Sequence, residues 1–87
     1  MTTIPGPQSW LFIRIASADN IQRFYYIALQ PALLDTEGQW SVLRIYGRIG
    51  GAQHEMAPMA FADWESARVY AKKLAQIRVK RGYVLAR

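Results

Sequence analysis

The 87-residue chain contains no cysteine and a single histidine. The absence of cysteine excludes disulfides, thiol redox motifs and thiolate metal sites together. His54 alone cannot supply the ligands of an ordinary zinc site, and we interpret it as a surface residue. We therefore expect no metal and no cofactor, in a chain that is compatible with a reducing compartment.

Long apolar runs are also missing. Nowhere do 18 apolar residues follow one another, so no segment is expected to cross a membrane. The segment Met1–Ser9 lacks the basic region and the apolar run of an export signal. The sequence thus predicts a cytoplasmic protein with no membrane partner. Its length leaves room for one domain, expected over residues 9–87, after a disordered N-terminal tail over residues 1–8.

The residues of the common catalytic motifs are scarce. The six carboxylates are dispersed along the chain, and most of them suit turns or helix caps. The serines lack the glycines of a nucleophile elbow. The glycines of Gly47–Gly51 lack the Lys-Ser/Thr pair that completes a nucleotide-phosphate loop, and we assign them to a turn and a close approach. We therefore predict a binding protein that is not an enzyme and has no small-molecule substrate.

Positive charge, by contrast, is abundant. Eleven lysines and arginines against six acids give a formal charge of +5, which favours a polyanionic partner. No acid follows Glu65, and the cations beyond it are Arg68, Lys72, Lys73, Arg78, Lys80, Arg81 and Arg87. A solvated helix face remains an alternative explanation, because cations also suit the negative end of a helix dipole.

Alternating apolar residues predict strands over residues 9–16, 23–30 and 53–61, with another beginning at Trp40. The second of these is apolar on both sides, which indicates a central place in the sheet. Pro31 is expected to end its pairing, and residues 35–38 to lead back into an antiparallel neighbour. Gly50-Gly51 then permits a tight reversal, and Pro58 indicates that the last strand has an edge position or a bulge.

A helix is predicted between Asp63, a suitable N-cap, and Gly82, a suitable residue after the last turn. Its expected apolar stripe comprises Trp64, Ala67, Tyr70, Ala71, Leu74 and Ile77. Arg78 should lay its stem along this stripe with the guanidinium reaching outward. The expected fold is α+β: a small antiparallel sheet of four to five strands with one long amphipathic helix packed across it.

The strand that begins at Trp40 has the most distinctive pattern. Alternation places Trp40, Val42, Arg44, Tyr46 and Arg48 on one side and Ser41, Leu43, Ile45 and Gly47 on the other. We expect the second side to face the core and the ladder Arg44–Tyr46–Arg48 to face outward. Arginine grips phosphates and an aromatic ring covers a sugar or a base, so the ladder predicts binding of nucleic acid. Solvated strand residues are the simpler alternative.

Further basic residues extend this hypothesis. Arg23 precedes the aromatic run Phe24–Tyr26, and Lys72, Lys80 and Arg81 belong to the basic helix and its end. No feature would read base edges, so we expect binding without sequence specificity. The alternative is a protein-interaction or homo-oligomerisation module that uses the same aromatic-arginine face, with Trp40 and Tyr46 exposed, and an edge strand.

A family resemblance supports the first hypothesis. Its residues are Asn20, Arg23–Tyr26, Leu29–Gln30, Trp40–Arg44, Gly47–Gly50, Gln53, Phe61, Ala67 and Gly82–Tyr83. Over Asn20 to Tyr83 the chain resembles a WGR domain, the module of DNA-dependent poly(ADP-ribose) polymerases and of short bacterial proteins, and the connection Gln30–Leu34 looks more like the bacterial branch.

The resemblance implies roles for individual residues. Arg48 takes the place of the arginine in the Trp-Gly-Arg triplet that names the family, and Tyr46 takes the place of its tryptophan. Asn20 and Arg23 lie where the family approaches the DNA backbone. DNA ends, nicks or junctions are the implied partners. The polymerase's catalytic domain is absent from this chain, so no ADP-ribosyltransferase activity is implied.

Overall fold

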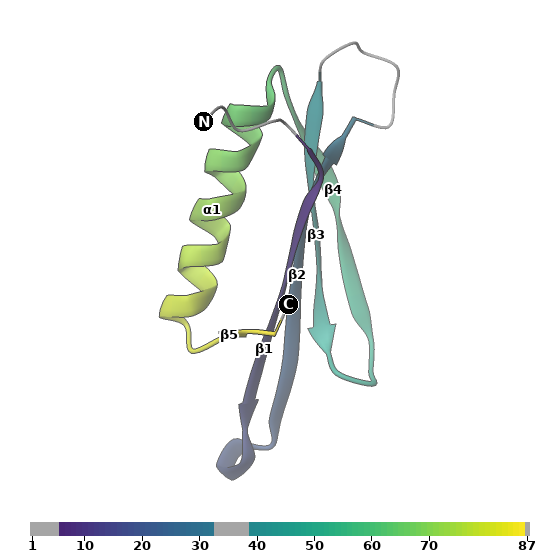
Figure 1. Ribbon diagram of the computed structural model, residues 1–87. Helices are drawn as coiled ribbons and strands as arrows, with labels where there is room; N and C mark the ends of the chain where they lie inside the picture. The colour runs from purple at the N-terminus through teal and green to yellow at the C-terminus, as the bar shows by residue number, and fades with distance from the viewer. Residues whose placement is uncertain (1–5, 33–38, 87) are drawn as a thin grey trace.

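The computed structural model describes residues 6–32 and 39–86. They form a five-stranded antiparallel sheet in the order β4-β3-β2-β1-β5, with one helix lying across one face (Figure 1). The elements are β1 (Gln8–Ala16), η1 (Ser17–Asp19), β2 (Ile21–Pro31), β3 (Trp40–Arg48), β4 (Gln53–Phe61), α1 (Trp64–Lys80) and β5 (Val84–Leu85). The predicted α+β class is confirmed, with β2 at the centre of the sheet.

The pairing of β2 with β3 continues further than expected. Pro31 still lies opposite Trp40, and the amide of Ala32 donates to the carbonyl of Gln39 at 3.0 Å. Pro31 therefore removes one backbone donor, but the pairing between β2 and β3 does not end at this residue. The expected connection over residues 35–38 lies outside the described residues.

The expected N-terminal tail also overlaps the fold. Gln8 already pairs with Leu29 in the sheet. The indole Nε1 of Trp64, in the first turn of α1, donates to the carbonyl of Gly6 at 2.9 Å. Gly6 and Gln8, which belong to the expected tail, therefore contact the described fold. Residues 1–5 lie outside the described residues.

The turn between β3 and β4 agrees with its glycines. Gly50 has a φ of +75°, and the amide of Gly51 donates to the carbonyl of Arg48 at 3.0 Å. Gly47 serves a different purpose: a Cβ there would run into the carbonyl oxygen of Ala52, so only glycine fits. The predicted turn and close-approach functions of these glycines are both confirmed.

β4 is the free edge strand that Pro58 predicts. The register shifts between Val42, opposite Met59, and Arg44, opposite Met56, so β4 carries one extra residue in this interval. Pro58 lies within the resulting bulge, where a missing backbone donor disrupts no ladder. Both structural expectations for this strand are therefore met.

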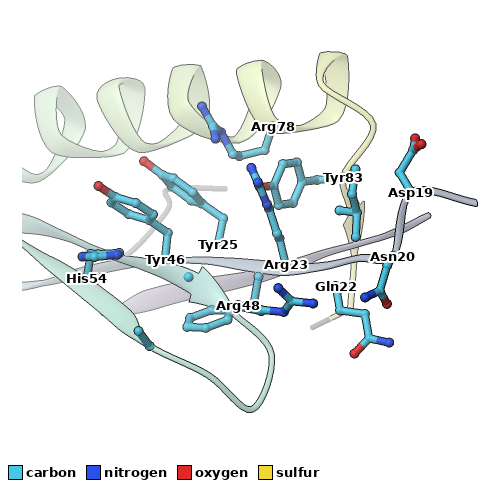
Figure 2. A pocket seen from close by; sticks show the side chains of 14 residues that line it. Asp19, Asn20, Gln22, Arg23, Tyr25, Tyr46, Arg48, His54, Arg78 and Tyr83 are labelled. Carbon is cyan, nitrogen blue, oxygen red and sulfur yellow. The ribbon is translucent and has the colours of Figure 1, made fainter. Parts of the chain in front are cut away.

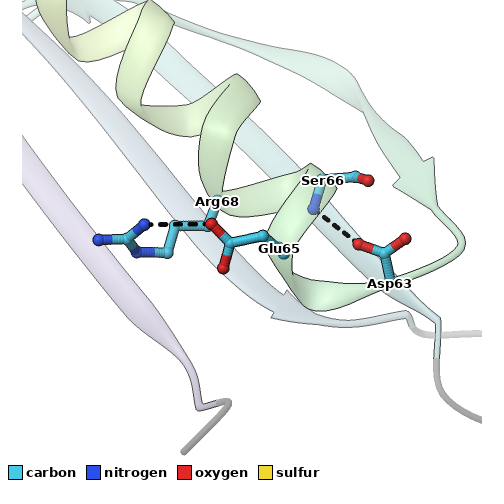
Figure 3. A network of polar contacts seen from close by, with 4 residues as sticks. All are labelled: Asp63, Glu65, Ser66 and Arg68. Carbon is cyan, nitrogen blue, oxygen red and sulfur yellow. Dashed lines mark hydrogen bonds and ion pairs between the residues drawn. The ribbon is translucent and has the colours of Figure 1, made fainter. Parts of the chain in front are cut away.

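The N-terminus of α1 is capped as expected. The carboxylate of Asp63 accepts a 2.7 Å hydrogen bond from the amide of Ser66, and this bond lowers the pKa of Asp63 from its ordinary value of 3.8 (Figure 3). One turn along, Arg68 and Glu65 form a 3.4 Å ion pair. The cap satisfies a helical amide that has no partner within the helix.

The C-terminus of α1 closes with the expected glycine. Gly82 has a φ of +88° and donates to the carbonyl of Val79, while the amide of Tyr83 reaches back to the carbonyl of Arg78 at 3.0 Å. This pair of bonds is a Schellman motif. It directs Tyr83 back toward the sheet and leads the chain into β5, which pairs with β1.

The core lies between α1 and one face of the sheet, which we call the inner face. Its buried residues are Phe12, Tyr25, Ile27, Leu29, Val42, Trp64, Ala67, Ala71 and Leu74. The predicted helix stripe is correct up to Leu74. Ile77 was expected to face inward but is 41% exposed, and the half-buried Arg78 faces the sheet instead.

The core also corrects the orientation of β3. Val42 is buried in the core, and Trp40 and Tyr46 pack against it, so the side that carries Arg44, Tyr46 and Arg48 is the inner face. Leu43 and Ile45 lie on the opposite, outer face, which no described element covers. The expected outward-facing ladder is therefore wrong. Alternation sorts residues onto two sides but cannot tell which side a helix will cover when both carry large apolar groups.

No helix in the described part of the chain is both long and apolar enough to cross a membrane.

Candidate nucleic-acid interface

Antiparallel register aligns similar side chains across the inner face. Phe12, Tyr25, Tyr46 and His54 form a cross-strand row of rings on β1 to β4. The next row, two residues along each strand, consists of Arg14, Arg23 and Arg48, which we call the arginine row. Side chains on one face alternate along a strand but are neighbours across strands, so rings and guanidinium groups come together.

The inner face opens into a groove beneath the last turn of α1 (Figure 2). Its volume is about 610 Å³. The groove is lined by Asp19, Asn20, Ile21, Gln22, Arg23, Phe24, Tyr25, Tyr46, Gly47, Arg48, Ala52, His54, Arg78 and Tyr83. A hydrogen bond of 2.9 Å from the Ile49 amide to the Gln22 carbonyl ties the β3–β4 turn to the start of β2 at this rim.

Three rings of this row, those of Tyr25, Tyr46 and His54, form a stack along one wall of the groove. Tyr25 and Tyr46 lie nearly parallel, with ring centroids 5.7 Å apart and 14° between their planes. His54 continues the stack, 5.4 Å from Tyr46 and tilted by 35°. Tyr46 therefore has a ring on each side, and the exposed His54 is the outermost member. The expected free face on Tyr46 for a sugar or base is already occupied.

Arg78 joins the stack from the helix. Its guanidinium carbon lies 4.2 Å from the centroid of the Tyr25 ring and 5.5 Å from that of Tyr83. Its Nε is buried and has no hydrogen-bond partner. Contrary to expectation, the guanidinium lies against the sheet at the wall of the groove and does not extend away from it, because the two tyrosine rings attract it through cation–π interactions.

The arginine row lacks compensating charge. Arg23 lies directly opposite both Arg14 and Arg48, an arrangement in which like charges repel. Within residues 6–32 and 39–86, the only ion pair joins Arg68 to Glu65, far along the helix. Asp19 lines the rim of the groove but pairs with none of these cations. The groove is thus electropositive and has hydrogen-bond donors to offer to an anion.

The structure brings together half of the residues predicted from the sequence. Asn20, Arg23, Tyr46 and Arg48 line the groove. Arg44, Lys72, Lys80 and Arg81 do not. Arg44 is half-buried one row further along the inner face, opposite Ile27, and the other three lie exposed on α1 and at its end.

Sequence reasoning missed other residues of the groove. Among them are Gln22, Tyr25, His54, Arg78 and Tyr83. Tyr25 could have been found from the register of a β2–β3 hairpin, which places it opposite Tyr46. Arg78 was harder to predict as a groove residue, because the only indication in the sequence is that this cation lies in line with the apolar residues of the helix. His54 is exposed, as predicted, but it belongs to the ring stack.

Comparison of the sequence with models of known protein families identifies the class of domain to which the chain belongs. The family model of the WGR domain matches residues 9–87, which is essentially the whole chain. The chain therefore belongs to the WGR domain family, a class of nucleic-acid-binding modules and not of catalytic domains. No curated protein and no solved structure matches the chain.

Proposed function

We propose that this WGR domain binds DNA at strand ends, nicks or junctions, and that the groove beneath the last turn of α1 is the binding site. One observation carries the proposal: the arginine row adjoins a stack of rings in an open groove, and no described carboxylate pairs with it. A polyanion would relieve the repulsion between these arginines and take up their unused donors.

The shape of the groove favours a strand end over the side of a duplex. Pockets that bury a drug-sized ligand measure roughly 300–1,000 Å³, and the volume of about 610 Å³ falls within this range. Among the described elements, no helix or hairpin projects from the groove in a way that could enter a DNA groove. A terminal or unpaired nucleotide can enter, while the rest of the duplex lies across the rim.

The residues have distinct parts in this proposal. Arg23 and Arg48 bind phosphate oxygens through forked donors, and Asn20 contacts the backbone at the rim. The exposed ring of His54, at the open end of the stack, takes the sugar or base contact that Tyr46 was expected to make. Outside the groove, Arg44, Lys72, Lys80 and Arg81 add an attractive field without fixed contacts.

Binding to three DNA forms tests this function. Equilibrium titrations of blunt linear, nicked and closed circular duplex over a salt series should give the weakest binding to the closed circle. Arg48→Ala should lower the log–log salt slope by about 0.9, the value for one lost phosphate contact. Equal affinity for all three forms would reject the preference for ends. An unchanged affinity of Arg48→Ala would reject the groove as the site.

A further inference from the structure

The outer face of the sheet has an unusual composition. An antiparallel sheet covered on one side normally directs apolar residues to the core and polar ones to solvent. Here the four strand arginines, Arg14, Arg23, Arg44 and Arg48, all lie on the inner face. Glu55 is the only charged residue that the described strands direct outward.

Apolar side chains occupy the middle of the outer face in register. They form four successive rows that run across the strands. The first row contains Leu43, the second Leu11, Tyr26 and Ile45, the third Val84, Ile13 and Phe24, and the fourth Ile15. Ile15 is 65% exposed and Val84 is 70% exposed. Figure 1 shows α1 on one side of the sheet only, with no labelled element on the other. The other members of these rows are half-buried, and no described element covers them. An apolar cluster left uncovered in this way is typical of an interaction site.

We propose that the outer face packs against the same face of a second copy, giving a two-fold dimer with the two grooves on opposite sides. Charge distribution favours a second copy as the occupant. In most relative orientations two chains of charge +5 bring cations together, whereas the described strand residues of the outer face include no cation. When the two outer faces meet, the sheets pack ~10 Å apart. The two arginine rows, on the inner faces, then lie on opposite sides of the dimer with both sheets between them.

The size of the face is sufficient for such a contact. Strands of nine residues are about 30 Å long, and four of them at a ~4.8 Å spacing give a projected area on the order of 500 Å² per copy. Side-chain relief raises the accessible area above this figure, toward the ~800 Å² per partner of a standard interface. A symmetric contact also uses each residue twice, so a single substitution acts at two places.

Sedimentation equilibrium of the whole chain over a concentration series tests the dimer. The expected mass rises from 9.9 kDa toward twice that value. Ile15→Lys and Val84→Lys should each lower the association constant by about 100-fold or more, because each buries two lysines in the contact. Val69→Lys, at an exposed valine on α1, is the matched control and should associate like the unmodified chain.

A second measurement guards against misfolded variants. Both lysine variants replace highly exposed side chains, so their monomers should keep a cooperative thermal transition. A chain that stays monomeric up to about 1 mM would overturn the proposal, since another protein or another segment of this chain would then have to cover the face. A dimer that survives both variants would also overturn it, because such a dimer must use another surface, such as the edge of β4. This test does not depend on DNA binding, so either proposal can fail alone.

Discussion

The guanidinium of Arg78 lies 4.2 Å from the centre of the Tyr25 ring, with its buried Nε lacking a partner. A charged group held in this way carries an unmet hydrogen-bonding capacity at the wall of the groove. Replacing it with methionine keeps an unbranched apolar stem over the ring and removes both the charge and the orphaned donor.

We expect Arg78→Met to separate stability from binding. Its free energy of unfolding should change by less than about 1 kcal/mol, because loss of the cation–π attraction is offset by removal of the unsatisfied Nε. Its affinity for a DNA end should fall about tenfold, because one positive charge is removed from the lining of the groove, a loss of ~1.4 kcal/mol. Urea denaturation and a titration measure the two effects. A large loss of stability together with unchanged binding would show that Arg78 is purely structural.

Two arginines of β3 provide a matched comparison. Arg44 and Arg48 share a strand and a face, but only Arg48 lines the groove. Arg48→Ala should therefore weaken binding to DNA ends about tenfold or more, whereas Arg44→Ala should weaken it by much less and equally for linear and circular DNA. Titrations at two salt concentrations distinguish these outcomes. Equal effects of the two substitutions would mean that the basic charge matters and the groove does not.

Gly47 should be intolerant of any side chain. A Cβ there would collide with the carbonyl of Ala52 and lie 2.8 Å from the Cα of Gln53, and only backbone could move to make room. We expect Gly47→Ala to cost about 2 kcal/mol or more of unfolding free energy. Gly6→Ala, where a Cβ meets nothing within 4 Å, should change it by less than about 0.5 kcal/mol. Equal stabilities of the two variants in urea denaturation would contradict this packing.

The helix cap makes stability depend on pH. The Ser66 amide lowers the pKa of Asp63 in the folded chain, so the charged carboxylate stabilises the fold. This contribution is complete above the unfolded pKa, near 3.8, and is lost as the pH falls through the lower, folded pKa. Asp63→Asn retains an acceptor but cannot titrate.

Thermal unfolding of both proteins between pH 2 and pH 6 should therefore give a difference in Tm that shrinks as the pH falls. A difference that stays constant across this range would show that the charge of Asp63 contributes nothing to the cap.

The fold could largely be read from the sequence because its signals are local. Asp63 and Gly82 set the ends of the helix, and Gly50 and Pro58 set a turn and an edge, all through backbone chemistry that needs no knowledge of distant contacts. The orientation of β3 could not be read in this way. Leu43 with Ile45 and Trp40 with Val42 are equally suitable for a core, and only the position of the helix decides between them.

Only some residues of the candidate site could be predicted from the sequence, for a related reason. Arg23, Tyr46 and Arg48 attract attention as cations and rings close together in sequence. Tyr25 and His54 join them through cross-strand register, and Arg78 through the rotation of a helix over the sheet. The cross-strand register and the rotation of the helix both arise from tertiary packing, so neither can be read from the sequence of one strand or helix.

The most direct test of the central claim is amide chemical-shift mapping with a short duplex that carries one free end. The account predicts that the perturbed amides cluster in three segments that contain the lining residues of the groove: residues 20–25, 46–54 and 78–83. Perturbations confined to the outer face, around Leu11, Leu43 and Ile45, or spread evenly along the exposed side of α1, would contradict it.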